Sequence, residues 1–306
     1  MNKVYFGDCR DSMRQMAKDG VKVQMCVTSP PYYGLRDYGV GGQIGAEQTP
    51  QEFIDNLVEV FACVWDILAD DGTLWVNLGD TYSAGGRGAG SEIQSANKGS
   101  ITGNVLGTWK VEGYRPKNLL GMPWKLAFAL QEFGWNLRQD IIWHKPNPMP
   151  ESVTDRCTKS HEYIFLLSKN QKYYYDYEAI KEPAENAGKV GGSFKGRQGG
   201  AEYHAQGGGV GSEAKEYESR NKRLVWTVNT STFKGAHFAT YPEELIEPCI
   251  LAGSKVGDIV LDPFFGSGTT GQAAQNLGRK WIGCELNKEY KTLQNQRLQQ
   301  QGLELV

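Results

Sequence analysis

The sequence predicts an α/β protein built on a doubly wound, mostly parallel sheet of seven strands. Apolar runs of strand length alternate along the chain with segments whose apolar residues recur at the helical period, which is typical of βαβ units. Several of these runs close on polar residues, and the carboxyl ends of parallel strands meet at one edge of a sheet. We therefore expect that edge to hold the functional groups.

Length and composition indicate one enzyme-sized unit with at most a smaller appended lobe. The chain has 306 residues, 40% of them hydrophobic, and no run approaches the roughly 18 apolar residues of a membrane span, so we expect a cytoplasmic protein. The formal net charge is -2, so a nucleic-acid partner has to be held by a local basic face. The six cysteines form no CxxC pair, which predicts reduced thiols and no metal site.

The first predicted elements form a βαβ unit. Residues 3–8 have the character of a short strand, 11–18 place two methionines on one side of a helix, and 23–27 form a buried strand. This strand has to end at Ser29, because the two prolines that follow fix φ and lack an N–H donor.

A longer helix and a further buried strand follow. Pro50 and Glu52 open the helix, its apolar residues keep the helical period, and Asp71-Gly72 ends it. Residues 73–80 form the next buried strand, which again closes with polar groups. From 83 to 107 the sequence consists of glycine, serine and small polar residues, which predicts a mobile loop.

The middle of the chain carries two more strands. Pro123 begins a helix that runs through residue 133, and apolar runs at 139–143 and 163–167 flank the proline-rich connection 145–150. We expect these two strands to pair antiparallel, as the exception to the otherwise parallel order.

The C-terminal part repeats the pattern of strand, turn and helix. A helix opens at Pro242, residues 258–262 form a strand, and the glycine-rich turn 263–271 leads into a helix that ends near Leu277. Residues 281–285 are the last strand, and a polar helix follows it.

The segment from Thr28 to Gly34 is the first candidate for a functional site. Its two prolines hold the Ser29 hydroxyl, the Ser29 and Pro30 carbonyls and the Tyr32 ring in a stiff cluster. Such a cluster suits an exocyclic amino group on a flat heterocycle, because its N–H groups are accepted while the ring stacks. An ordinary strand-to-loop corner would show the same residues, so the motif by itself leaves both interpretations open.

The turn after Asp262 is the second candidate. Gly266, Gly268 and Gly271 give the pattern G-x-G-x-x-G at the start of a helix, and Glu285 ends the next strand about twenty residues on. A dinucleotide fits this pattern, and an amino-acid nucleoside fits it too, since its carboxylate would satisfy the helix N-terminus. A glycine-rich turn that binds nothing is the remaining alternative.

A glycine-rich, charged stretch over about 182–223 differs in composition from its surroundings. It is either a disordered insertion or a recognition lobe that orders on a polyanion. Its basic and aromatic residues include Lys195, Arg197, Tyr203, His204, Arg220, Lys222 and Arg223.

These motifs resemble those of an amino-group DNA methyltransferase that uses S-adenosylmethionine. Ser29-Pro30-Pro31-Tyr32 resembles the catalytic tetrapeptide of that family, and residues 262–271 resemble its cofactor loop. The catalytic motif precedes the cofactor motif, as in the β class of the family, which is a circular permutation of the usual order. The resemblance implies a circularly permuted, Rossmann-like methyltransferase sheet whose strand ends face one crevice, with an inserted recognition region.

The resemblance also assigns roles to individual residues. Glu285 would hold the cofactor ribose, and Asp8, with the backbone of Cys9, would hold the adenine. The expected catalytic residues are Ser29, Pro30, Pro31 and Tyr32. The other expected cofactor residues are Asp262, Phe264, Phe265, Gly266, Ser267, Gly268, Thr269, Thr270, His237 and Phe238. The expected contacts with DNA are Tyr33, Lys145, Asn147, Arg197, Arg220, Lys222 and Arg223.

The resemblance further implies how the chain is divided. Residues 1–170 would be the catalytic part of the methyltransferase domain, 171–232 a DNA target-recognition region, and 233–306 the cofactor-binding part of the same domain. Double-stranded DNA is the expected partner, and neither a membrane nor a metal is expected. A homodimer and a cognate restriction endonuclease are left open.

The predicted reaction is site-specific transfer of a methyl group from S-adenosylmethionine to the exocyclic N4 of a cytosine flipped out of DNA. Serine before Pro-Pro-Tyr favours cytosine, whereas Asp or Asn is usual there in N6-adenine enzymes, so N6-adenine is the alternative. A non-catalytic DNA-binding subunit would keep the same fold. A nicotinamide dehydrogenase would leave the segment at Ser29 unexplained.

Overall fold

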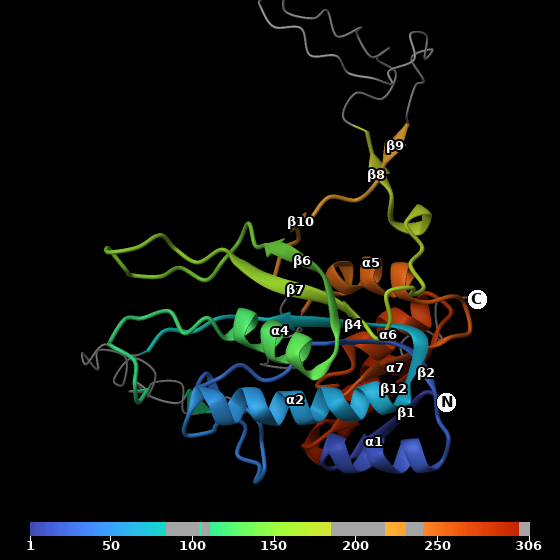
Figure 1. Cartoon of the computed structure of the whole chain (residues 1–306), viewed down its shortest axis with the longest axis horizontal. Coiled ribbons are helices and arrows are strands. Elements are labelled where there is room, and N and C mark those ends of the chain that lie inside the picture. Colours follow the sequence, from blue (N-terminus) through green and yellow to red (C-terminus); the bar gives the residue numbers. More distant parts are fainter. Residues whose placement is uncertain (84–103, 106–110, 185–217, 231–240, 300–306) are drawn as a thin grey trace, which may run out of the picture. The chain divides into compact units, whose positions relative to one another are not determined.

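A computed structural model describes residues 1–83, 104–105, 111–184, 218–230 and 241–299 (Figure 1). The chain falls into two units, of which the larger combines Met1–Asp176 with Leu224–Val306 and the smaller is Tyr177–Arg223. The larger unit holds the main sheet and the cleft described below.

Eight strands form the main sheet of the described residues: β1 (Lys3–Phe6), β2 (Val23–Thr28), β4 (Leu68–Leu78), β6 (Asn136–His144), β7 (His161–Ser168), β10 (Val225–Thr227), β11 (Ile259–Asp262) and β12 (Lys280–Glu285). Their order across the sheet is β1-β12-β11-β2-β4-β7-β6-β10. β7 runs antiparallel to both of its neighbours, and the other neighbouring pairs are parallel. The mostly parallel sheet and the antiparallel pair of β6 and β7 are thereby confirmed.

β10 is one strand more than the seven predicted. It has three residues, of which only Trp226 is buried, so it shows neither the length nor the apolar run that marks the other strands. β10 lies parallel to β6, and next to it the Trp143 indole donates from Nε1 to Val228 O at 2.9 Å. Tertiary packing rather than local sequence therefore places this strand.

The strand order shows the circular permutation directly. If β11 is counted as the first strand and the two chain ends are joined, the five parallel strands take the order 3-2-1-4-5 of a doubly wound sheet. The order reverses between β11 and β2. Ligands of such sheets bind outside the carboxyl ends of the strands at this switch point, which here lies between Asp262 and Thr28.

Helices pack on both faces of the sheet (Figure 1). α1 (Cys9–Lys18), α2 (Pro50–Ile67) and α4 (Met122–Phe133) share one core cluster with alternate residues of β2 and β4, among them Cys26 and Leu74. α5 (Glu243–Gly253) packs on the opposite face, where a methyl group at Gly253 would lie 3.1 Å from Met25 Sδ. α6 (Thr269–Asn276) contacts α5, and α7 (Lys291–Gln299), which the short η3 (Lys288–Tyr290) precedes, contacts α6.

α2 has a clear start signal and no clear end signal. Thr49 and Glu52 form a capping box, in which Glu52 N donates to Thr49 Oγ1 at 3.2 Å and the Glu52 carboxylate accepts from Thr49 N. The predicted end at Asp71-Gly72 is wrong, because Leu68 takes the extended angles φ −73° and ψ 141° and begins β4. Leu68 is fully buried in the strand, as it would be in a helix, so its apolar character could not mark the boundary.

The smaller unit contains η2 (Glu178–Ile180) and an antiparallel pair, β8 (Glu182–Pro183) and β9 (Ser219–Arg220). Ala184 N donates to Glu218 O at 3.1 Å, so the pair closes the two ends of the segment 185–217. Glu182 Oε1 lies 2.8 Å from Arg220 Nε and 2.5 Å from Arg223 Nε.

Some predictions fall on residues outside the described ones. The predicted loop 83–107 lies there, apart from Ser83 and β5 (Asn104–Val105), which pairs antiparallel with β3 (Arg36–Asp37). Also outside the described residues are Lys195, Arg197, Tyr203, His204, His237 and Phe238. Within the described ranges, no helix is long and apolar enough to cross a lipid bilayer.

Candidate active site

A cleft of about 1080 Å³ opens at the carboxyl ends of the parallel strands, within the larger unit. Pockets for single drug-sized ligands hold about 300–1,000 Å³, so the cleft has room for more than one group. Of the residues expected from the sequence, it is lined by Asp8, Cys9, Ser29, Pro30, Pro31, Tyr32, Lys145, Asp262, Phe264, Phe265, Gly266, Ser267, Thr269 and Glu285. The fold therefore brings both sequence motifs to one place.

The catalytic segment Ser29–Gly34 turns sharply out of β2. Gly34 takes φ +65° and donates from its N–H to Gly45 O at 2.9 Å, so the segment folds against the loop that follows it. Tyr33 anchors the turn, because its side chain is 1% exposed and its hydroxyl donates to Gln48 O at 3.2 Å. Tyr33, which we expected to contact DNA, thus lies in the core and does not line the cleft.

Tyr32 has its hydroxyl fixed by residues of β4 and β7. It donates to Glu162 Oε2 at 2.7 Å and lies 3.2 Å from Asn77 Oδ1. A Cβ atom at Gly79 would come within 2.5 Å of the Tyr32 ring, so glycine at this position leaves room for the ring. Burial, and after it the Glu162 carboxylate, raises the pKa of Tyr32 well above its usual value, so the hydroxyl stays protonated.

Glu162 joins three cleft residues: Asn77 within β4, Tyr32 in the segment after β2, and Lys145 directly after β6. Its Oε2 also accepts from Asn77 Nδ2 at 3.2 Å, and its Oε1 pairs with the Lys145 ammonium. The side chains of Glu162 and Lys145 are 11% and 17% exposed, and the ammonium lies 4.1 Å from the centre of the Trp143 ring. A carboxylate is therefore hydrogen-bonded directly to the aromatic residue of the catalytic segment.

A second lysine lines the same cleft. Lys159 donates to Asp80 O at 2.6 Å, and burial lowers the pKa of its ammonium. The Asp80 carboxylate accepts from the backbone N–H groups of Thr81, Gly121 and Met122 at 2.9 to 3.1 Å. Asp80 is thus committed to holding the start of α4.

The buried Asp262 links the catalytic strand to the cofactor loop. It is 2% exposed, and its carboxylate accepts from Thr28 Oγ1 at 2.6 Å, from Phe264 N and Tyr241 OH at 3.0 Å, and from the Thr270 hydroxyl. Burial raises the pKa of Asp262, and these donors act against the rise. A carboxylate has about four lone-pair sites, so the chain itself fills the capacity of Asp262.

The glycine-rich turn packs around the ring of Phe265. The ring stacks on Trp281 with centres 5.0 Å apart, and Cβ atoms at Gly271 or Gly283 would come within 2.6 and 2.3 Å of it. These two glycines therefore make room for Phe265. Gly268 takes φ +89° where α6 begins, which favours glycine for a different reason.

α7 supports the turn with two polar side chains. Gln294 Nε2 donates to Gly266 O at 2.8 Å, and Arg297 donates to the hydroxyls of Ser267, at 2.7 Å, and Thr269. Burial lowers the pKa of Arg297, whose side chain lies beneath the loop with 6% exposure. The polar helix for which the sequence suggested no role thus holds the glycine-rich turn 263–271 in shape.

Glu285 ends β12 at the edge of the cleft. Its carboxylate accepts from Gly266 N and from Asn287 N, each at 2.8 Å and each through a different oxygen. It is 9% exposed, and burial raises its pKa to about 7. Two hydrogen bonds do not exhaust a carboxylate, so Glu285 keeps acceptor capacity for a ligand hydroxyl.

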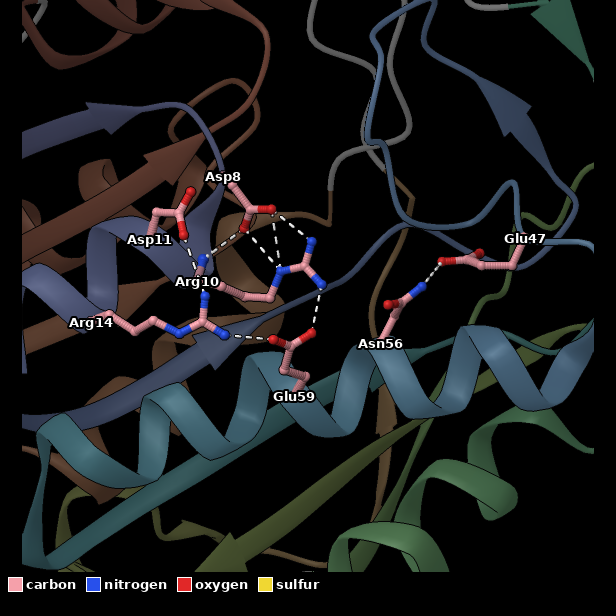
Figure 2. A network of polar contacts seen from close by, with 7 residues as sticks. All are labelled: Asp8, Arg10, Asp11, Arg14, Glu47, Asn56 and Glu59. Carbon is pink, nitrogen blue, oxygen red and sulfur yellow. Dashed lines mark hydrogen bonds and ion pairs between the residues drawn. The ribbon is translucent and has the colours of Figure 1, made fainter.

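Asp8 belongs to a network of charges at the start of α1 (Figure 2). It accepts from Arg10 N at 2.8 Å, which caps the helix, and its Oδ2 lies 2.6 Å from Arg10 NH2. Glu59 of α2 pairs with the same guanidinium at 2.8 Å and with Arg14 at 2.5 Å. The hydrogen bond from Arg10 lowers the pKa of Asp8, which keeps this carboxylate ionised beside the cleft.

The expected contacts with DNA lie in different parts of the chain. Lys145 lines the cleft, whereas Asn147 ties the proline-rich connection to Thr230, whose N–H donates to Asn147 Oδ1 at 2.9 Å. Arg220, Lys222 and Arg223 belong to the smaller unit.

Several cleft residues received no individual role from the sequence, among them Asn77, Lys159, Glu162 and Tyr241. Asn77 closes a predicted strand, so the rule that strand ends share an edge could have found it. Glu162 stands at the start of a strand instead. Because β7 is antiparallel, its start meets the carboxyl ends of the other strands, and only the pairing direction reveals this.

The thiols take no part in the cleft chemistry described here. Cys157 is exposed, and Cys9, Cys26, Cys63, Cys249 and Cys284 are buried without a disulfide. Burial raises the pKa of Cys26 and of Cys284 well above the usual value. In the part of the chain that the structure describes, no three His, Cys, Asp or Glu side chains cluster as a metal site would require.

The sequence is similar to DNA methylases over most of its length. The profile of the family described as DNA methylase matches residues 23–296. The chain is 47% identical over 296 residues to the type II methyltransferase M.SmaI of Serratia marcescens, and this match covers 97% of this chain and 90% of that protein. It is 45% identical over 303 residues to M.Cfr9I of Citrobacter freundii, also a type II methyltransferase, which covers 99% of this chain and 89% of that protein.

Solved structures share the fold at lower identity. The cytosine-N4-specific PvuII DNA methyltransferase gives a TM-score of 0.63 at 18% identity, covering 96% of this chain and 85% of that one. The complex of M1.HpyAVI with S-adenosylmethionine gives a TM-score of 0.58 at 19% identity, and the match covers 97% of this chain and 99% of that one.

Proposed function

Given that the chain belongs to the DNA methylase family, and is thus an S-adenosylmethionine-dependent DNA methyltransferase that acts on an exocyclic amino group, we propose that its acceptor is N4 of cytosine. The observation that carries the choice of base is Ser29, a neutral hydroxyl at the head of the catalytic segment that lines the cleft. N6-adenine enzymes usually have Asp or Asn at the corresponding position.

The lysines of the cleft support the same choice. On its Watson–Crick edge, cytosine presents a ring nitrogen and a carbonyl oxygen as acceptors besides its amino group, whereas adenine presents a ring nitrogen and a C–H group there. Lys145 and Lys159 supply N–H donors in the cleft that also holds Ser29. The cytosine-N4-specific PvuII methyltransferase, whose fold is similar, is consistent with this assignment.

The ends of β11, β12 and β1 fit S-adenosylmethionine. Glu285 keeps acceptor capacity for the ribose hydroxyls, and the backbone of the turn and the N-terminus of α6 suit the ligand carboxylate. Asp8 and the backbone of Cys9, at the start of α1, would hold the adenine. When bound, this cofactor supplies a methyl group on a sulfonium, which is a good leaving group.

The catalytic segment prepares the amino group. The Ser29 hydroxyl and the Pro30 carbonyl accept its two N–H groups, and the Tyr32 ring offers a stacking face for the flipped base. These acceptors favour a pyramidal amino group, whose lone pair is otherwise delocalised into the ring. Asp262 fixes Thr28, next to Ser29, to the cofactor loop, so both reactants are held on one frame and orientation supplies much of the rate gain.

We assign target recognition to residues 171–232, and the methyltransferase domain to 1–170 and 233–306. The basic stretch within 171–232 is anchored by β8 and β9, which bring its two ends together. Its arginines and lysines, Arg197, Arg220, Lys222 and Arg223, are the residues that would contact phosphates.

Mass spectrometry of nucleosides tests the choice of base. DNA treated with the enzyme and S-adenosylmethionine should contain N4-methylcytosine, and the Ser29→Ala variant should form it at least about 100-fold more slowly. N6-methyladenine without N4-methylcytosine would refute the cytosine assignment and leave the fold and the cofactor site standing.

A further inference from the structure

Methylation of an amino group leaves one proton to be removed. The amino nitrogen forms a bond to the methyl carbon, the carbon–sulfur bond breaks, and its electron pair stays on sulfur. The nitrogen is then positively charged and has to release a proton. A hydroxyl and a peptide carbonyl accept hydrogen bonds but are weak bases, so the proton needs a further acceptor within reach of Ser29.

Most acids of the cleft are engaged in other contacts. The acids that line it are Asp8, Asp80, Glu151, Glu162, Asp262 and Glu285. Four donors from the chain fill the carboxylate of Asp262, and three backbone N–H groups engage that of Asp80. Asp8 pairs with Arg10, and Glu151 lies 2.6 Å from the Arg156 guanidinium. Glu285 holds the turn on the cofactor side through Gly266 N.

Glu162 differs because it contacts the catalytic segment itself. Its Oε2 accepts from Tyr32 OH at 2.7 Å, and Ser29, which is three residues before Tyr32 and lines the same cleft, acts to lower the pKa of that hydroxyl. Catalytic hydrogen bonds are often long in the free enzyme and tighten once the substrate is bound. Ser29, Tyr32 and Glu162 therefore form a row of groups that can each pass a proton to the next.

We infer that Glu162 is the final acceptor of the proton released by the amino group, which reaches it through Ser29 and Tyr32. The amino nitrogen gives a proton to Ser29 Oγ, Ser29 gives its own to Tyr32, and Tyr32 gives its own to Glu162. The methylated base leaves neutral, both hydroxyls keep one proton, and Glu162 holds the proton until water re-enters the cleft. The inference rests on the proposed function, because it requires the amino group at Ser29.

Two neighbouring side chains hold the Glu162 carboxylate in place. Asn77 donates to the same Oε2 that faces Tyr32, and the ion pair with Lys145 fixes the other oxygen. Asn77 also donates to Tyr163 O at 3.1 Å, so its own orientation is set by the backbone of β7. The carboxylate consequently has one orientation, in which Oε2 is turned toward the tyrosine hydroxyl.

Single-turnover methyl transfer tests the relay. Glu162→Gln and Tyr32→Phe should each slow the step at least about 100-fold, the usual contribution of a positioned base, with the affinities for S-adenosylmethionine and DNA unchanged. The double variant should be no slower than the slower single variant, because groups that act as one unit are not additive. In Glu162→Ala, added acetate should raise the rate in a saturable manner, since it can take up the proton in the space left free.

Glu47→Gln is the matched control. Glu47 likewise accepts from an asparagine amide, at 2.9 Å from Asn56 Nδ2 of α2 (Figure 2), but it does not line the cleft. The Glu47→Gln enzyme should transfer the methyl group as fast as the wild type. A Glu162→Gln enzyme as fast as the wild type, or a slow Glu162→Ala enzyme that acetate does not restore, would overturn the relay while N4-methylcytosine from the wild type upholds the proposed function. A wild type that methylates no base would overturn both.

Discussion

Glu285 and Asp262 end neighbouring strands, yet their surroundings give them different roles. Four donors from the chain fill the carboxylate of Asp262, which therefore joins structural elements. Glu285 accepts from two backbone N–H groups and keeps capacity for a ligand. Burial raises the pKa of both, to about 7 for Glu285, so the charge of Glu285 changes in the neutral range.

The affinity for S-adenosylmethionine should fall as the pH drops below about 7. The pKa of Glu285 is raised from 4.5 to about 7, so the cofactor-free protein takes up a proton as the pH falls through that value. A protonated acid has fewer acceptor sites for the ribose hydroxyls. The loss approaches about tenfold per pH unit if only the ionised form binds, and calorimetry across this range measures it.

Glu285→Gln is the control for this titration. It should bind the cofactor more weakly by roughly 1.5 to 3 kcal/mol, the value of a charge-assisted hydrogen bond, and its affinity should not change with pH in this range. An affinity that is the same for variant and wild type would remove Glu285 from the cofactor site. By the same linkage, the stability contributed by this group is present below pH 4.5 and lost as the pH rises through about 7.

At the scale of the elements, the sequence predicted correctly the strands and helices whose apolar pattern fits only one type of secondary structure. The strands with long buried runs and the helices with a helical period were found, as β2, β4 and α2 illustrate. The junction of α2 and β4 was misplaced because Leu68 is buried in either element, and β10 was missed because it is three residues long. The hydrogen bond of Tyr32 to Glu162 spans 130 positions, so no local pattern could have indicated it.

The glycines around the cofactor loop show the same limit. Gly271 completes a ligand-binding pattern in the sequence, whereas in the structure it makes room for the Phe265 ring. Gly283 on β12 does the same, although it lies outside the pattern. Which glycine faces a ligand and which faces a neighbouring side chain depends on packing between elements.

Gly283→Ala should destabilise the protein by about 1–3 kcal/mol, the usual cost of overpacking a core. The added Cβ would lie 2.3 Å from the Phe265 ring, which is itself stacked on Trp281. Urea denaturation measures the change in the free energy of unfolding. Gly41→Ala, whose Cβ would meet no atom within 4 Å, is the control and should change stability by less than about 0.5 kcal/mol. Equal stabilities for the two variants would contradict this packing argument.

At the scale of the whole molecule, we assign the cofactor and the flipped base to the larger unit and contacts with the DNA phosphates to the smaller one. The cleft is lined by residues of the larger unit, whereas the smaller unit holds basic residues next to β8 and β9. In the free protein, Glu182 pairs with Arg220 and Arg223. Glu182 and Arg220 are half-buried and Arg223 is exposed, so these pairs lie near the surface, where ion pairs contribute little to stability and phosphates can take over the arginines.

Replacing Arg220, Lys222 and Arg223 by Ala should flatten the salt dependence of DNA affinity. The slope should fall by up to about one unit for each lost phosphate contact, while cofactor binding is kept. Titrations at several salt concentrations measure it. Glu182→Gln is the matched control, since it removes the carboxylate with which both arginines pair and should leave the slope at least as steep. An unchanged slope in the triple variant would make this stretch a passive linker.

β11 and β12 lie between β1 and β2 in the sheet, although they follow all the other strands in chain order. During synthesis, β1 and β2 therefore leave the ribosome long before β11 and β12, the strands that separate them in the sheet, have been made. Until that moment, both strands present open edges of the kind that pair wrongly with other chains. Asp262 and Glu285 arrive with the late strands, so the cofactor site proposed above is complete only once synthesis has passed them.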